Sequence, residues 1–228
     1  MELQGTKALS KRTMALAAGA PILLMAVIAG VVMGTLFNDL FSLQGDDLLQ
    51  TVNSSRQAFG WGILGWIIIL LCDIVAAWAL GVFYASVNKQ IAQLTAWMRF
   101  LYSAILGTAI AFLVMAYHLV STQSGGQIAM QLQEYINGFQ YTWSFGLILF
   151  GFHLAGLSYL VWQKSWFFRG LSILLGAAAI GYLIIHSGNL LLPNFDEYKA
   201  SIETIFMLPM ILGEVGLAIW LVAKGGKN

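Results

Sequence analysis

The stretch GLILFGFHLAGLSYLVW, Gly146 to Trp162, is almost wholly apolar, yet it carries one titratable ring, His153, near its centre. It belongs to a longer apolar run, and a helix needs roughly 20 mostly apolar residues to cross a bilayer. Further runs of the same kind occur along the whole chain. The sequence therefore predicts an all-α protein with six membrane-spanning helices, at residues 14–37, 59–86, 91–121, 139–163, 170–192 and 205–223.

The composition indicates an integral membrane protein whose main partner is the lipid bilayer. Of the 228 residues, 59% are hydrophobic and 9% are charged, whereas about a quarter of the residues of a soluble domain are charged. A net charge of +1 without a basic run excludes a nucleic-acid binder. The single cysteine, Cys72, leaves no partner for an intramolecular disulfide. We expect residues 1–228 to form a single transmembrane domain, a six-helix bundle.

The distribution of charge predicts the orientation of the bundle, because cytoplasmic segments carry an excess of Lys and Arg. If the N-terminus is cytoplasmic, only Arg56 and Lys199 of the 11 Lys and Arg residues face outward. The acidic residues then lie mostly outside. We therefore predict that both termini are cytoplasmic.

The outer loops contain segments that are typical of short interfacial helices. Asp46 and Asp47 after Gly45 make a favourable helix start within residues 42–60. The segment QIAMQLQEYI, residues 127–136, has the composition of a second such helix.

Ionisable side chains inside the spans are the informative residues, since a charge at the bilayer centre costs about 2.5–3.5 kcal/mol and normally faces protein or water. Asp73, His153 and Glu214 lie near mid-depth in three spans that run in the same direction, and we expect them to meet. Ala77 and Gly81 follow Asp73 at fourth-residue spacing, and such a small-residue face turns Asp73 toward other helices.

Further polar candidates lie along the third and fifth spans. Tyr182, His186 and Asn189 share one face of the fifth span, and His118 lies near the outer end of the third. Arg99, near the inner end of the third span, is both a candidate for the site and a candidate topology anchor. Together these residues predict a polar pocket that is deepest at the two acids and opens outward.

Other small-residue stripes are expected to face helices of this chain or of a second subunit, because small side chains let backbones approach closely. These stripes are Ala26, Gly30 and Gly34; Ser103, Gly107 and Ala111; and Ala177 and Gly181.

Specific enzyme motifs are missing from the sequence: it has no HExxH, GxxxxGK[ST], GxSxG or CxxC pattern. His118, His153 and His186 with a carboxylate are weak candidates for a catalytic zinc site, which needs three protein ligands. His118 and His186 would also suit a bis-histidine haem. The sequence requires neither cofactor. Each buried histidine or acid is also compatible with a plain hydrogen-bonded packing role.

Several long segments resemble a known family. The run LFGFHLAGLSYLVWQKSWFFRGLSILLGAAAIGYLI, the later LPMILGEVGLAIWLVAKG and the earlier LCDIVAAWALGVFYASVNKQIAQLTAWMRF are similar to the bacterial multi-pass membrane proteins of DUF4386, a domain of unknown function. Phe168 departs from the proline that the family often has before the arginine matched by Arg169. The resemblance implies a six-helix protein of the bacterial cytoplasmic membrane and implies no activity.

The functional hypothesis is a membrane-embedded binding or sensing module, whose outward-opening polar pocket takes a small ligand, a cation or a proton. Two alternatives stay open. One is an intramembrane enzyme, with or without a metal, and the other is a structural or accessory subunit that packs on a homo-oligomeric or membrane-complex partner.

Overall fold

The computed structural model describes residues 10–122 and 127–227. Over these ranges it is helical and contains no strand. Six helices are long and apolar enough to cross a membrane, so the predicted all-α class and the six spans are confirmed. The elements are α1 (Lys11–Val32), the π-helical turn η1 (Met33–Phe37), α2 (Asn38–Leu40), α3 (Gly45–Ser54), α4 (Arg56–Tyr84), α5 (Lys89–Thr122), α6 (Ile128–Val161), α7 (Trp166–Leu191) and α8 (Asp196–Ala223).

The loop helices differ in part from the expectation. The first, α3, is present and buries Leu48 and Val52 on one face. The segment expected to form a second, separate helix is instead the beginning of α6. Ile128, Leu132 and Ile136 are all buried, so one apolar stripe runs without a break into the span, and a helix with such a stripe has no reason to stop.

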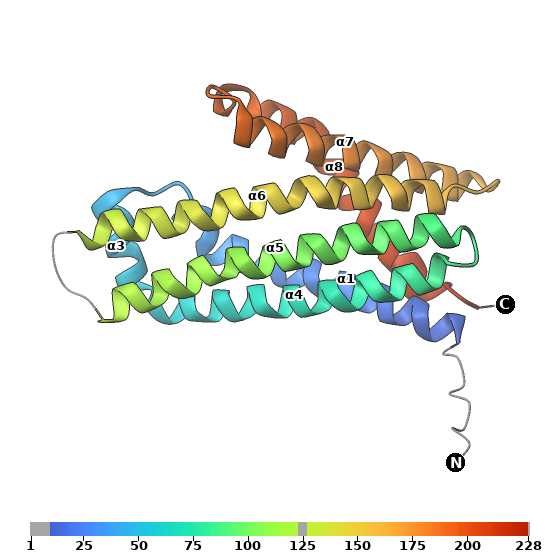
Figure 1. Ribbon diagram of the computed structural model, residues 1–228, viewed down its shortest axis with the longest axis horizontal. Coiled ribbons are helices and arrows are strands. Elements are labelled where there is room, and N and C mark those ends of the chain that lie inside the picture. Colours follow the sequence, from blue (N-terminus) through green and yellow to red (C-terminus); the bar gives the residue numbers. More distant parts are fainter. Residues whose placement is uncertain (1–9, 123–126, 228) are drawn as a thin grey trace, which may run out of the picture.

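The six long helices form a ring in chain order. Each packs on its neighbours in sequence, α1 on α4, α4 on α5, α5 on α6, α6 on α7 and α7 on α8, and α8 closes on α1. Short connections favour such neighbour packing. In Figure 1, α1 begins and α8 ends at the same end of the bundle, while α3 lies at the opposite end, here called the α3 end. The ring leaves a central space that side chains from all six spans can reach.

The seam between α1 and α8 closes this ring. Gly19 of α1 lies so close to α8 that an added Cβ would be 2.8 Å from a backbone oxygen. Arg12 donates hydrogen bonds to the carbonyl oxygens of Leu221 and Gly225, at 3.0 Å each, and of Val222, at 2.5 Å. The last carbonyls of a helix lack intrahelical partners and carry the negative end of its dipole. The guanidinium therefore caps α8 and ties it to α1.

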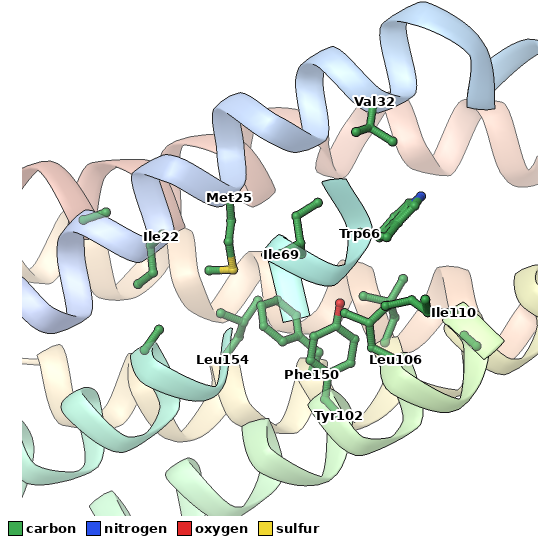
Figure 2. Close-up of a cluster of buried hydrophobic side chains, with 14 of the residues drawn as sticks. Ile22, Met25, Val32, Trp66, Ile69, Tyr102, Leu106, Ile110, Phe150 and Leu154 are labelled. Atoms are coloured by element: carbon green, nitrogen blue, oxygen red, sulfur yellow. The ribbon is translucent and has the colours of Figure 1, made fainter. Parts of the chain in front are cut away.

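Near the α3 end, the last turns of α1 and η1 pack on α4 through aromatic rings. The wider turn η1 carries Phe37, which is fully buried and lies 5.5 Å from Phe59 and 6.4 Å from Trp66 between ring centroids. Gly62 leaves the space for it, since an added Cβ there would be 2.2 Å from the Phe37 ring. Figure 2 shows side chains from α1, α4, α5 and α6 pointing toward one another deeper in the bundle, among them Met25 and Ile69.

The small-residue stripes have different outcomes. On α4, Ala77 is fully buried and an added Cβ at Gly81 would meet Ala96 on α5 at 2.9 Å, as expected for a helix contact. On α1, an added Cβ at Gly30 or Gly34 would have no atom of the described part of the chain within 4 Å. These two glycines therefore face no other helix of the ring, because fourth-residue spacing defines a face but not the direction in which it points.

Candidate functional site

A buried ion pair lies at the centre of the ring. Arg99 on α5 and Asp73 on α4 are each 2% exposed. The Arg99 Nε and Nη2 atoms lie 2.7 Å and 2.5 Å from Asp73 Oδ1. Ser103, one turn after Arg99, places its Oγ 2.9 Å from Asp73 Oδ2. An isolated buried charge is strongly unfavourable, so each of the two charges depends on the other, and together they fix α4 against α5.

His153 attaches α6 to this pair. Its Nδ1 lies 2.9 Å from the Thr95 carbonyl oxygen, and its Nε2 lies 3.1 Å from Arg99 Nη1. A carbonyl only accepts and a guanidinium only donates, so Nδ1 carries the proton, Nε2 accepts, and the ring is neutral. Phe150, one turn earlier on α6, covers the guanidinium with 5.1 Å from Arg99 Cζ to the ring centroid. These contacts give His153 a defined place in the apolar stretch of α6.

Glu214 on α8 is the fourth member of the cluster. Its Oε1 lies 3.8 Å from Arg99 Nη1, and its side chain is 20% exposed. That distance exceeds the range of a direct hydrogen bond. With a neutral His153, one guanidinium faces two carboxyl groups, so the cluster carries one excess negative charge when both are ionised. Arg99 is thus shared by Asp73, His153 and Glu214, which come from α4, α6 and α8.

The cluster forms one wall of a cavity of about 440 Å³, here called the central cavity. All six long helices contribute to its lining. Its charged residues are Asp73, Arg99 and Glu214, and its aromatic residues are Trp66, Tyr102, Trp143, Phe150 and Tyr182. Figure 2 shows part of this wall, with Trp66, Tyr102 and Phe150 reaching inward from three helices. Ile211 of α8 also lines the cavity and is 52% exposed. The cavity therefore reaches the lipid-facing surface beside α8.

A second, more polar cavity of about 610 Å³ lies at the α3 end and is here called the vestibule. Ser144 on α6 joins two residues of α7, because its Oγ lies 2.9 Å from His186 Nδ1 and accepts a hydrogen bond of 3.2 Å from Asn189 Nδ2. Lys199 of α8 donates to Asn189 Oδ1 at 3.3 Å. The vestibule thus has its own hydrogen-bonded network, separate from the ion pair at the centre.

The two cavities adjoin. Met33 and Trp143 line both of them. Tyr182 of the central cavity stacks on His186 of the vestibule, with 5.7 Å between ring centroids, and packs on Phe150 at 5.2 Å. A row of rings therefore connects the polar end of the bundle with the ion pair.

The three histidines do not come together. His118 is exposed on α5, where its ring packs beside Tyr117 at 6.0 Å, while His153 belongs to the central cluster and His186 to the vestibule. Within residues 10–122 and 127–227, no group of three or more His, Cys, Asp or Glu side chains is placed to hold a metal ion. The described residues therefore do not form the three-histidine arrangement, and of the two histidines considered for a haem, His118 is exposed whereas His186 lines the vestibule.

Some residues of the site have roles that the sequence predicted only in part or not at all. For Arg99 the sequence left open a place in the site or a role as a topology anchor, and the structure buries it at the centre. Lys199 counted only as an outward charge, and Ser103 only as a small contact residue. Ser144 carried no signal of its own. The one available clue was that Arg99 and Ser103 lie one turn apart on the inward face of a span, beside a span that carries a buried acid.

Comparisons with known proteins give a family and a relative. The sequence matches the family described as "Domain of unknown function (DUF4386)" over residues 17–225. An uncharacterized protein of Archaeoglobus fulgidus is 29% identical over 167 residues, which cover 73% of this chain and 85% of the relative. No solved structure matches the chain.

Proposed function

The chain belongs to DUF4386, a family of unknown function, and we propose its function from the geometry of the site. The protein is a membrane-embedded binding or sensing module. Its central cavity takes up a small ligand, a cation or a proton at Glu214. One observation carries this proposal: Glu214 lies at a cavity, 3.8 Å from the guanidinium that Asp73 and His153 hold in place.

The members of the cluster have different tasks in this proposal. Asp73 and His153 use their hydrogen-bonding atoms on Arg99, Ser103 and a backbone carbonyl, so they position the guanidinium. Among the residues that the structure describes, Glu214 makes only the longer ion pair, and its carboxyl group stays available. A cation or proton at Glu214 would compete with Arg99 for this carboxylate. Binding would therefore alter the contacts that α4, α5 and α6 make with one another through Arg99.

The orientation of the site follows from the positive-inside rule. In Figure 1, the starts of α1 and α5 and the connection between α6 and α7 lie at the end of the bundle where α8 ends. By sequence, these segments carry Lys11, Lys89, Lys164 and Arg169. We place this end in the cytoplasm and the vestibule on the outer side of a bacterial cytoplasmic membrane, with residues 1–228 as one domain. The vestibule then provides an outward route to the central cavity.

Carboxyl modification tests the proposal. Dicyclohexylcarbodiimide is an apolar reagent that reacts with protonated carboxyl groups, and mass spectrometry of peptides locates the adduct. In protein reconstituted in lipid nanodiscs, we expect an adduct on Glu214. The Glu214→Gln variant should lose that adduct, and Glu197→Gln, which removes an exposed acid of the same helix, should keep it. Because only the protonated carboxyl group reacts, the labelling is repeated over a series of acidic pH values. If Glu214 reacts at no pH at which the protein stays folded, it is not available to any ligand and the proposal fails.

A further inference from the structure

We infer that the ligand of the central cavity is a small organic cation, an amine or quaternary ammonium group on an apolar body. This inference rests on the proposed function and names the ligand class of the same site. Two independent features of the cavity support it: the sign of its free charge and the chemistry of its walls.

The first feature is the sign of the charge. The guanidinium of Arg99 already faces Asp73 through Nε and Nη2 and His153 through Nη1. Glu214 makes no contact shorter than 3.8 Å to that guanidinium. An anionic ligand would therefore meet two carboxyl groups and an occupied guanidinium. A cation would find the carboxylate of Glu214, which makes no direct hydrogen bond to any side chain that the structure describes. A charge-assisted contact to a buried carboxylate is among the stronger polar contacts in proteins.

The second feature is the wall. Five aromatic residues line the cavity, and the remaining lining is mainly aliphatic. Aromatic faces attract organic cations, most strongly where water is excluded. Inorganic cations such as Ca²⁺ or Mg²⁺ instead require a cage of oxygen ligands, which a wall of this kind does not supply. A volume of about 440 Å³ falls in the range of small-molecule sites, roughly 300–1,000 Å³.

The position of the cavity also provides an entrance for such a molecule. Exposed Ile211 and exposed Ala26 both line the cavity, one on α8 and one on α1. The cavity is thus open toward the bilayer at these two helices. An amine with an apolar body concentrates in the bilayer because burial of apolar surface is favourable, and it can enter from there.

A charge series of matched probes tests the inference. Calorimetric titration of nanodisc-embedded protein with phenethylamine, 2-phenylethanol and 3-phenylpropionate compares a cation, a neutral molecule and an anion of similar shape, with empty nanodiscs subtracted. We expect saturable binding of phenethylamine only. Glu214→Gln should weaken it by about tenfold or more, and the control Glu197→Gln should bind as the unmodified protein does.

The outcomes separate this inference from the proposed function. If carbodiimide modifies Glu214 in the folded protein but phenethylamine does not bind, the organic-cation inference is wrong and the proposed function stands. If the anion binds, or if amine binding is unchanged in Glu214→Gln, the inference is also wrong. If Glu214 is unreactive and no probe binds, both fail.

Discussion

Replacing Arg99 with Met should destabilise the protein more than almost any other single substitution. Arg99 and Asp73 are each 2% exposed and in direct contact. Loss of the guanidinium leaves the carboxylate of Asp73 buried with only Ser103 as a donor, and removal of one partner of a buried ion pair costs about 3–5 kcal/mol. We expect Arg99→Met to lower the free energy of unfolding by that amount and Asp73→Leu to lower it comparably.

The double variant tests the physical reason. In Arg99→Met with Asp73→Leu no charge of the pair remains buried, and apolar replacement of a whole buried pair is often neutral or stabilising. We expect the double variant to be at least as stable as either single variant. Unfolding in mixed detergent and SDS micelles, followed by circular dichroism, gives all the free energies. A loss below about 1 kcal/mol for Arg99→Met, or additive losses in the double variant, would refute the argument, because residues in contact should show coupling of about 0.5–3 kcal/mol.

Three further predictions use the same unfolding assay. Gly62→Ala places a Cβ 2.2 Å from the Phe37 ring and should cost about 1–3 kcal/mol, whereas Gly30→Ala, which has open space, should leave stability unchanged or raise it by up to about 1 kcal/mol. An equal loss at both sites would contradict the packing of η1 on α4. Arg12→Ala removes three hydrogen bonds to the end of α8 and should cost about 1–3 kcal/mol, with Arg12→Lys intermediate. Glu214→Gln should change stability by less than about 1 kcal/mol, since it breaks no direct hydrogen bond. A loss as large as that of Arg99→Met would show that Glu214 is a structural member of the ion pair.

The sequence predicts the spans well because the requirement for apolar length is local. The bilayer imposes it on each helix separately, and hydropathy alone identifies the six helices. The start of α6 was harder to predict from the sequence, because residues 128–136 are polar on one side. Their continuity with the span depends on burial of Ile128, Leu132 and Ile136 against other elements.

The candidate site was predictable only in part, for a similar reason. The cost of charge in hydrocarbon indicates that Asp73 and Glu214 need partners, but it does not identify them. Arg99 lies near the end of a predicted span, where a basic residue usually extends to the membrane surface. The folded ring turns it inward instead, and that direction is set by the rotation of α5 between α4 and α6. The sequence of a single helix does not determine this rotation, because it depends on the neighbouring helices.

The seam between Arg12 and the end of α8 also has a consequence for biosynthesis. Its donor and its most distant acceptor are 213 residues apart, so translation at about 5–20 residues per second separates their emergence by roughly 10–40 s. The first span must therefore stay in the bilayer without its final partner until α8 has been synthesised. A nascent protein that stalls before the last span would expose the carboxylate and guanidinium of its interior to lipid, which makes it a clear substrate for quality-control proteases of the membrane.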